Sequence, residues 1–281
     1  MPSSISRRLS IRFWRRSGAG EGVNRIEWEI RSELLGPSLR SVLFKGLPDV
    51  VNEHLHNWHK DLILKWIEHR HPLRILDVGC GYGRLSTPVI KKFPTVDITG
   101  IDISENFVRL YQANTHHPAF VETVQNLPAP LGTFDYIICV TVLMYLDGEN
   151  LRRATSNLLF HLKPEGKLIV IEPHGSGDLF QTGFGIVSFI RNRLHRDAIY
   201  TLGRSFRRSE IDNLFNHAGG RILTECRLPI TSLFILPLAL IGRLLPKGWV
   251  RGIYKIVSFF DALLGQFKLP SLHVAYLVSR V

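Results

Sequence analysis

The stretch 75–84 reads ILDVGCGYGR and joins a short apolar segment to three glycines at alternate positions. An apolar strand that ends in a carboxylate, followed by Gly-x-Gly-x-Gly, lets the backbone turn tightly and lets a ligand lie against main-chain N–H groups. A residue with a Cβ atom would obstruct that approach. The stretch therefore predicts a strand, a nucleotide-cofactor loop and the start of a helix.

A second acid follows the loop. Residues 96–103, VDITGIDI, predict a strand that ends at Asp102. In nucleotide-binding folds, an acid about 20 residues beyond the glycine loop binds the ribose hydroxyls. A dinucleotide dehydrogenase needs its third glycine one position later, in Gly-x-Gly-x-x-Gly, but that position holds Arg84. Together the two motifs indicate an adenosine ligand other than NAD.

Three later segments complete the pattern. Leu127-Pro128, the segment 134–138 (FDYII) and the segment 162–170 (LKPEGKLIV) follow the loop and the acid in order. With them the chain, from roughly residue 50 to 228, resembles the class I S-adenosylmethionine-dependent methyltransferases, of the small-molecule acceptor type. The resemblance implies S-adenosyl-L-methionine as the cofactor. It also implies an α/β fold with a Rossmann-like seven-stranded sheet, mostly parallel with an antiparallel last strand, and helices on both faces.

The resemblance further implies which residues would hold the cofactor. Asp77 would contact the methionine amino group, the glycine loop would line the methionine and ribose, and Asp102 would chelate the ribose hydroxyls. Ile103 would press on the adenine, and Thr123 stands where the family often places an Asp that binds the adenine amine. The expected cofactor-binding residues are Asp77, Gly79, Cys80, Gly81, Gly83, Asp102, Ile103, Thr123, Val124 and Val140.

Two residues are candidates for acting on the acceptor. His174 follows the fifth expected strand at the carboxyl edge of the sheet, where ligands of open α/β sheets bind, and it is the candidate base. Tyr145, in the loop after the fourth strand, would orient the acceptor. A role as a polar loop residue is the alternative for His174. A carbanion or a readily ionised phenol as acceptor would need no strong base.

The expected organisation is a basic N-terminal arm and cap (1–50) followed by a methyltransferase domain (51–281). Within the domain, the stretch 231–268 is apolar and dotted with Arg and Lys, where the family has a short hairpin. Pro237 and Arg243 interrupt it before it reaches the roughly 20 residues that span a bilayer. It predicts an apolar helical insertion that contacts a membrane in-plane or covers an apolar substrate; packing on the domain or against a second subunit is the alternative.

The formal net charge is +11, which suits nucleic acid, a membrane surface or a phosphorylated substrate. Five arginines between residues 7 and 16 alternate with apolar residues, which fits a membrane-surface segment, a disordered tail or a mitochondrial presequence. We expect a cytoplasmic protein; peripheral membrane contact and, in a eukaryote, a mitochondrial location are the open alternatives.

Cysteine and histidine give no metal-ligand spacing. Cys80, Cys139 and Cys226 predict reduced core residues. Five histidines between residues 54 and 71 crowd an amphipathic helix expected to begin with Asn52 as its cap. We interpret them as a solvated helical face and expect no metal. In the family, a helix at this place lies over the cofactor pocket.

The acceptor class is inferred from what the sequence lacks. Residues 139–143 read CVTVL, where methyltransferases of exocyclic amines in nucleic acids carry Asn/Asp-Pro-Pro-Tyr/Phe, and no Pro-Cys nucleophile of the cytosine-C5 type is present. We therefore expect methyl transfer to an apolar or lipid-linked small molecule, to oxygen rather than carbon, and nucleic acid is disfavoured as a partner. A non-catalytic cofactor-binding scaffold or sensor and an RNA or DNA methyltransferase are the alternatives. The oligomeric state stays open.

Overall fold

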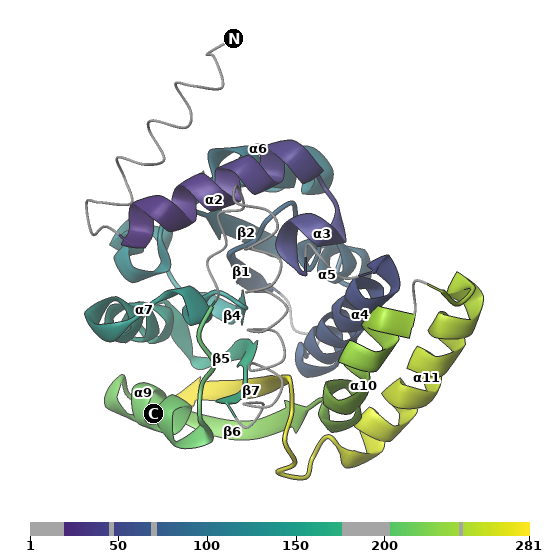
Figure 1. The fold of residues 1–281 in the computed structure, drawn as a ribbon. Helices are drawn as coiled ribbons and strands as arrows, with labels where there is room; N and C mark the ends of the chain where they lie inside the picture. The colour runs from purple at the N-terminus through teal and green to yellow at the C-terminus, as the bar shows by residue number, and fades with distance from the viewer. Residues whose placement is uncertain (1–19, 45–47, 69–71, 176–202, 242–243) are drawn as a thin grey trace.

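The computed structural model describes residues 20–44, 48–68, 72–175, 203–241 and 244–281, and one mixed sheet organises them (Figure 1). The strands are β1 (Arg74–Val78), β2 (Asp97–Asp102), β3 (Ala119–Val121), β4 (Phe134–Val140), β5 (Leu162–Pro173), β6 (Gly220–Arg227) and β7 (His273–Arg280). Their spatial order is β3-β2-β1-β4-β5-β7-β6. β7 runs antiparallel to β5 and β6, and the other neighbouring strands pair in parallel. The predicted fold class is confirmed.

Helices cover both faces of this sheet (Figure 1). α7 (Gly148–Phe160) and α9 (Arg208–His217) pack on one face, and α4 (Asp49–Trp66) and α5 (Ser86–Lys92) pack on the other. Neighbouring residues of one strand belong to opposite cores: Ile75 to the core that includes residues of α4 and α5, and Leu76 to the core that includes residues of α7 and α9. Strands buried on both faces read as continuous apolar runs, as the segment 134–140 does.

The remaining elements lie at the ends and edges of the sheet. α6 (Glu105–Thr115) contacts β2 and β3, and α2 (Gly20–Leu35) packs on α6 and on the short helix α3 (Leu39–Val42). Two 3-10 turns, η1 (Val124–Asn126) and η2 (Ala129–Leu131), follow β3, and a third, η3 (Leu143–Tyr145), follows β4. The arginine-rich segment 7–16 lies outside the described residues, and the expected boundary between residues 50 and 51 falls inside α4.

Two expectations about α4 are wrong. Asn52 does not cap the helix: it is buried in the second turn, and its side chain pairs with the backbone N–H and C=O of Phe44 at 3.1 and 2.9 Å. The histidine face is not solvated either, because His54 and His59 are buried. The reason is that α4 packs between α5 and the pair α10 (Pro229–Ile241) and α11 (Lys247–Leu264), so more than one of its faces is covered.

α10 and α11 occupy the connection between β6 and β7 and form the outer edge of the molecule beyond α4 (Figure 1). Val51 and Leu55 of α4 share a core with Ile235, Val250 and Tyr254. Within the described ranges, no helix has both the length and the hydropathy that crossing a bilayer requires. That this pair is an insertion relative to the family stays a prediction.

Candidate active site

A cavity of about 540 Å³ opens where β1, β2 and β4 end. Residues from all three strand ends line it, together with the glycine loop, the segment after β3, and parts of α2 and α3. Ligands of open α/β sheets bind at this carboxyl edge. The site therefore lies where the order of strands along the chain reverses direction from β1 to β4.

Most of the predicted site residues meet in this cavity. Gly83 and His174 are not among the described residues that line it. The predicted residues that do line it are Asp77, Gly79, Cys80, Gly81, Asp102, Ile103, Thr123, Val124, Val140 and Tyr145.

The glycine loop and the second-strand acid form one hydrogen-bonded unit. The Gly81 N–H donates to Asp102 Oδ2 over 2.9 Å, and the Ser104 N–H donates to Oδ1 over 2.9 Å. Gly79 has a φ of +67°, and a Cβ there would come within 2.4 Å of Val142 Cγ2. Both observations require a bare backbone at this bend. Gly83 serves a different purpose, since a Cβ there would collide with Thr115 of α6 at 2.6 Å.

The two acids at the strand ends are both buried. Burial raises the pKa of Asp102 to about 6, and the N–H bonds from Ser104 and Gly81 oppose that shift. Burial likewise raises the pKa of Asp77 to about 6, although Asp77 accepts a 2.7 Å hydrogen bond from Ser86 Oγ. Such acids suit ligand groups that donate hydrogen bonds or carry positive charge, because these favour the ionised carboxylates.

Arg84 is a site residue that sequence reasoning used only to exclude NAD. It lines the cavity although its side chain is almost fully buried, and no carboxylate among the described residues lies within ion-pair distance of it. Its guanidinium instead contacts His59 Nδ1 at 3.3 Å and His56 Nδ1 at 3.5 Å. Burial lowers the pKa of His56 to about 4, which leaves that ring neutral and able to accept. A buried cation at the glycine loop can bind a ligand carboxylate, while Asp77 can bind an ammonium.

The family resemblance implied that α4 would cover the cofactor pocket, and this expectation is wrong. The helical part of the cavity wall comes from α2 and α3 instead. Arg25 and Trp28 of α2 and Val42 of α3 line the cavity, whereas no described residue of α4 does. The Trp28 ring meets Tyr145 edge-on, with centroids 5.5 Å apart. Tyr145 follows the end of β4, so this aromatic pair stands at the β4 side of the cavity.

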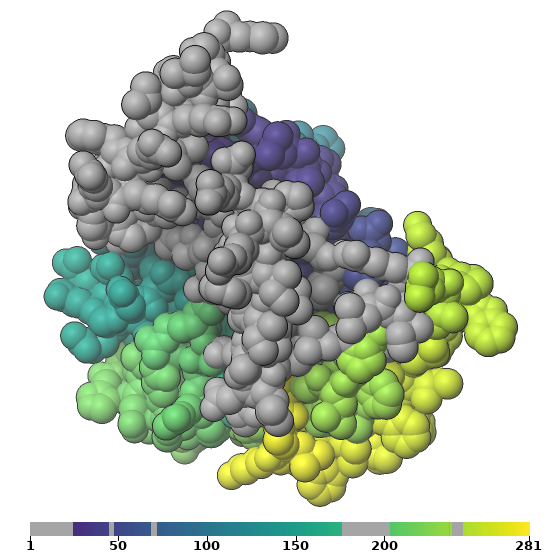
Figure 2. Space-filling model, viewed as in Figure 1, coloured from purple at the N-terminus to yellow at the C-terminus, as the bar shows by residue number. Residues whose placement is uncertain are grey.

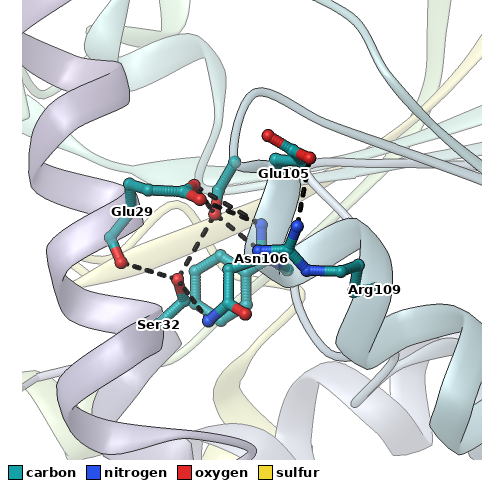
Figure 3. A network of polar contacts seen from close by, with 7 residues as sticks. Glu29, Ser32, Glu105, Asn106 and Arg109 are labelled. Carbon is teal, nitrogen blue, oxygen red and sulfur yellow. Dashed lines mark hydrogen bonds and ion pairs between the residues drawn. The ribbon is translucent and has the colours of Figure 1, made fainter.

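α2 is fastened to the start of α6 by a polar network (Figure 3). The Glu29 carboxylate accepts hydrogen bonds from Ser104 Oγ at 2.5 Å and from the Asn106 N–H at 3.2 Å. Ser32 Oγ accepts from Asn106 Nδ2 at 3.1 Å. Ser104 also caps α6 by accepting from the Phe107 N–H. One serine thus links the covering helix to the acid Asp102.

The loop after β4 is held in an unusual shape by a buried acid that sequence reasoning did not assign to the site. Thr141 lines the cavity with a φ of +56°, which is rare for a β-branched residue. The Glu172 carboxylate accepts the N–H groups of Val142, Leu143 and Met144 at 3.0, 2.8 and 3.2 Å. Burial raises the pKa of Glu172 to about 8, and these three bonds oppose the shift. Glu172 therefore positions the loop whose residues Thr141 and Val142 line the cavity.

His174 does not line the cavity. It follows β5, its N–H donates to the Leu272 carbonyl at 3.0 Å, and it pairs with Phe206 through a backbone bridge. Burial lowers its pKa to about 4. Of the two candidate residues, the structure brings Tyr145 to the cavity and leaves His174 outside it. In the described part of the chain, no three His, Cys, Asp or Glu side chains converge as a metal site.

Comparison with known proteins gives three findings: a matching family model, relatives of similar sequence and a solved structure of similar fold. Residues 76–168 match a family model described as a methyltransferase domain. A human tRNA N(3)-cytidine methyltransferase is 28% identical over 157 residues, which cover 52% of this chain and 41% of that protein. Its mouse counterpart is 27% identical over 194 residues, covering 59% and 50%. The chain thus spans about half the length of these relatives.

The third finding is structural. Magnesium protoporphyrin IX methyltransferase from Synechocystis PCC 6803, solved with bound SAH, superposes with a TM-score of 0.59 at 15% identity, covering 94% of this chain and 100% of that one. At this identity the likeness concerns the fold.

The tRNA-modifying relatives overturn two expectations: an apolar or lipid-linked small molecule as the acceptor, and nucleic acid as a disfavoured partner. The exclusion rested on motifs that serve exocyclic amines and cytosine C5. Neither motif is needed for a ring nitrogen, whose in-plane lone pair can attack a methyl group without losing a proton. The absence of these motifs argues against methylation of exocyclic amines and of cytosine C5, but it does not exclude methylation of a ring nitrogen in a nucleic acid.

Proposed function

This chain belongs to the class I S-adenosylmethionine-dependent methyltransferases, and we propose that it transfers the methyl group to a ring nitrogen of a nucleobase in RNA. The observation that carries the proposal is the cavity itself, in which a glycine loop and a ribose-type acid adjoin an aromatic pair, Trp28 and Tyr145. The tRNA-modifying relatives favour RNA over other acceptors.

The cofactor half of the cavity fits S-adenosylmethionine group by group. Asp102, already oriented by two backbone N–H groups, would accept the two ribose hydroxyls. Asp77 and Arg84 would bind the ammonium and the carboxylate of the methionine end, respectively. Ile103 and Thr123 line the part of the cavity at the ends of β2 and β3, where the adenine would lie.

The acceptor half fits a flat base. Trp28 and Tyr145 offer aromatic surface beside Thr141, and a base removed from its stack regains stacking energy on such rings, about 1–3 kcal/mol for each base. Arg25 at the rim of the cavity is exposed and cationic. Aromatic rings with a neighbouring cation are typical of sites for unpaired nucleotides.

A second hollow continues from the first and carries further positive charge. It shares Gln125 and Asn126 with the cavity, and Arg152 and Arg153 of α7 line its other side. An RNA backbone that leaves the cavity along α7 would meet these two guanidinium groups. Contacts of this kind position a nucleic acid without reading its sequence.

The chemistry needs positioning more than proton transfer. The bound cofactor supplies a methyl group on a sulfonium sulfur, which is already activated. The lone pair of the ring nitrogen would form the new N–C bond as the C–S bond breaks, and the positive charge would pass from sulfur to the base. No proton is removed, in keeping with the absence of histidine and lysine among the described lining residues. Val140, Thr141 and Tyr145 would align the base with the methyl group.

Transfer of a labelled methyl group tests the proposal. The chain is incubated with methyl-labelled cofactor and with purified tRNA, genomic DNA or a total lipid extract, and RNA products are digested to nucleosides. We expect label in a nucleoside of RNA methylated on a ring nitrogen. Label in the lipid fraction alone would overturn the proposal. Cofactor binding with no label in any fraction would favour the non-catalytic sensor.

A further inference from the structure

The outer face of α11 carries large apolar side chains that nothing in the described structure covers. The inner side of the helix, Val250, Tyr254, Val257 and Asp261, is buried against α4 and α10 at spacings of three and four residues. A second stripe at similar spacings faces outward. It consists of Trp249, Ile256, Phe259, Phe260 and Leu263, with Trp249 72% and Phe259 67% exposed.

The outward stripe continues on both neighbours of α11. Leu233 and Phe234 of α10 are exposed, and so are Leu244 before α11 and Phe267 and Leu269 after it. We call the whole set, residues 233, 234, 244, 249, 256, 259, 260, 263, 267 and 269, the α10–α11 surface. Figure 2 shows this helical pair as a rim that projects from the lower right of the molecule. Monomeric proteins seldom expose so many large apolar side chains in one place without a function.

The side chains beside the stripe are predominantly basic, which favours an anionic partner. Lys247, Arg251, Lys255 and Lys268 lie around the α10–α11 surface, and Asp261, which is buried, is the one acidic residue in the stretch 229–270. Arg251 is anchored to Glu53 of α4 by two hydrogen bonds of 3.0 Å. A second copy of the chain would bring the same positive charges to the interface, so self-association is electrostatically opposed.

We propose that the α10–α11 surface docks in the plane of an anionic lipid bilayer, with its aromatic side chains in the headgroup region and its lysines on the lipid phosphates. Exposed Trp and Phe beside Lys and Arg are the composition of interfacial helices. The absence of a bilayer-spanning helix among the described residues agrees with an in-plane contact. The inference concerns attachment alone and does not depend on the acceptor.

Vesicle co-sedimentation of the full chain tests this proposal. Wild type should bind vesicles that contain phosphatidylserine, should bind phosphatidylcholine vesicles more weakly, and should be released by salt. Trp249→Ala with Phe259→Ala should lower the partition coefficient by about 100-fold, since each buried aromatic side chain contributes about tenfold or more. The N-terminal arm is present in every variant, so the difference reports on the α10–α11 surface.

The matched control is Phe120→Ala with Phe160→Ala, two exposed phenylalanines on β3 and α7, outside the α10–α11 surface. This control should bind vesicles as wild type does, and both double variants should keep wild-type circular dichroism. Equal vesicle binding by wild type and the Trp249/Phe259 variant would overturn the proposal. The proposal would also be wrong if no protein, wild type included, bound vesicles and the Trp249/Phe259 variant instead lost self-association or RNA binding.

Discussion

The backbone N–H of Gly81 donates to the carboxylate of Asp102 across 2.9 Å, which joins the first glycine-rich bend to the end of the second strand. Because the Ser104 N–H holds the other carboxylate oxygen, the acid is fixed before any ligand binds. Folding has therefore already oriented the carboxylate, so a ribose that binds to it does not incur the entropy cost of ordering this side chain.

Asp102→Asn should weaken cofactor binding by about 100-fold, because one oxygen is replaced by an amide NH₂ that faces a backbone donor and the charge-assisted hydrogen bonds are lost. Isothermal titration with S-adenosylmethionine measures the loss. Asp97→Asn, at the exposed start of the same strand, is the matched control and should bind normally. Equal affinity in the two variants would mean that Asp102 does not hold the ribose.

Cofactor affinity should increase as the pH rises through about 6. The pKa of Asp102 and that of Asp77 are both raised to about 6 by burial, and donors on the ligand favour the ionised acids. Each carboxylate can therefore contribute up to about tenfold for each pH unit below 6, with a plateau above pH 7. Asp102→Asn should make the profile shallower. A profile that is flat between pH 5 and 8 would contradict this account.

The same acids have the opposite effect on the ligand-free protein. Their folded-state pKa values exceed those of the unfolded chain, so between about pH 4 and 6 the folded state binds more protons. Their contribution to the free energy of unfolding is complete below pH 4 and is lost as the pH rises through about 6. Denaturant titration of the Asp102→Asn variant against wild type at pH 5 and pH 7 should therefore show wild type losing more stability between the two values.

Trp28→Ala should reduce kcat/KM for RNA about 10-fold or more, because the base loses stacking surface, and it should leave the affinity for the cofactor nearly unchanged. Phe160→Ala removes an exposed aromatic side chain from the end of α7, outside the cavity, and serves as the control. A fall in cofactor affinity without a change in KM would assign Trp28 to the adenosine instead of the acceptor.

Glu29→Gln should loosen α2 without unfolding the sheet. It removes the charge from the carboxylate that accepts from Ser104 and Asn106, and charge-assisted hydrogen bonds of this kind contribute about 1.5–3 kcal/mol. Hydrogen exchange should become faster in residues 25–44 and stay unchanged in β1 and β4. Glu33→Gln alters an exposed acid of the same helix and should have no effect. Unchanged exchange in both variants would show that other contacts fasten α2.

Local patterns predicted the elements whose signal lies within the element itself. The glycine loop and the acid Asp102 each depend on neighbours in the chain, and the structure has them where the sequence indicated. The mostly parallel pairing and the antiparallel last strand followed from the family resemblance. β5 begins at Leu162, before the apolar run, because this part of the segment already pairs with β4 at Phe134.

The errors concern contacts between distant parts of the chain. His54 and His59 looked solvated because helical periodicity shows one buried face, whereas α10 and α11 cover another. The role of Glu172 was not recognised because its hydrogen bonds to the loop 142–144 join two strand ends that lie about 30 residues apart, and such support leaves no local signal. α2 gave no sign that it would cover the cavity, since its anchoring partners Ser104 and Asn106 lie more than 70 residues away.

A crystal structure of the chain with S-adenosylhomocysteine tests the central claim most directly. We predict the ribose hydroxyls on Asp102, the amino-acid carboxylate on Arg84, and the sulfur directed toward the space between Thr141 and Tyr145. A nucleoside bound elsewhere, with the Gly79–Gly81 bend filled by side chains and Asp102 turned away from the ligand, would contradict the account.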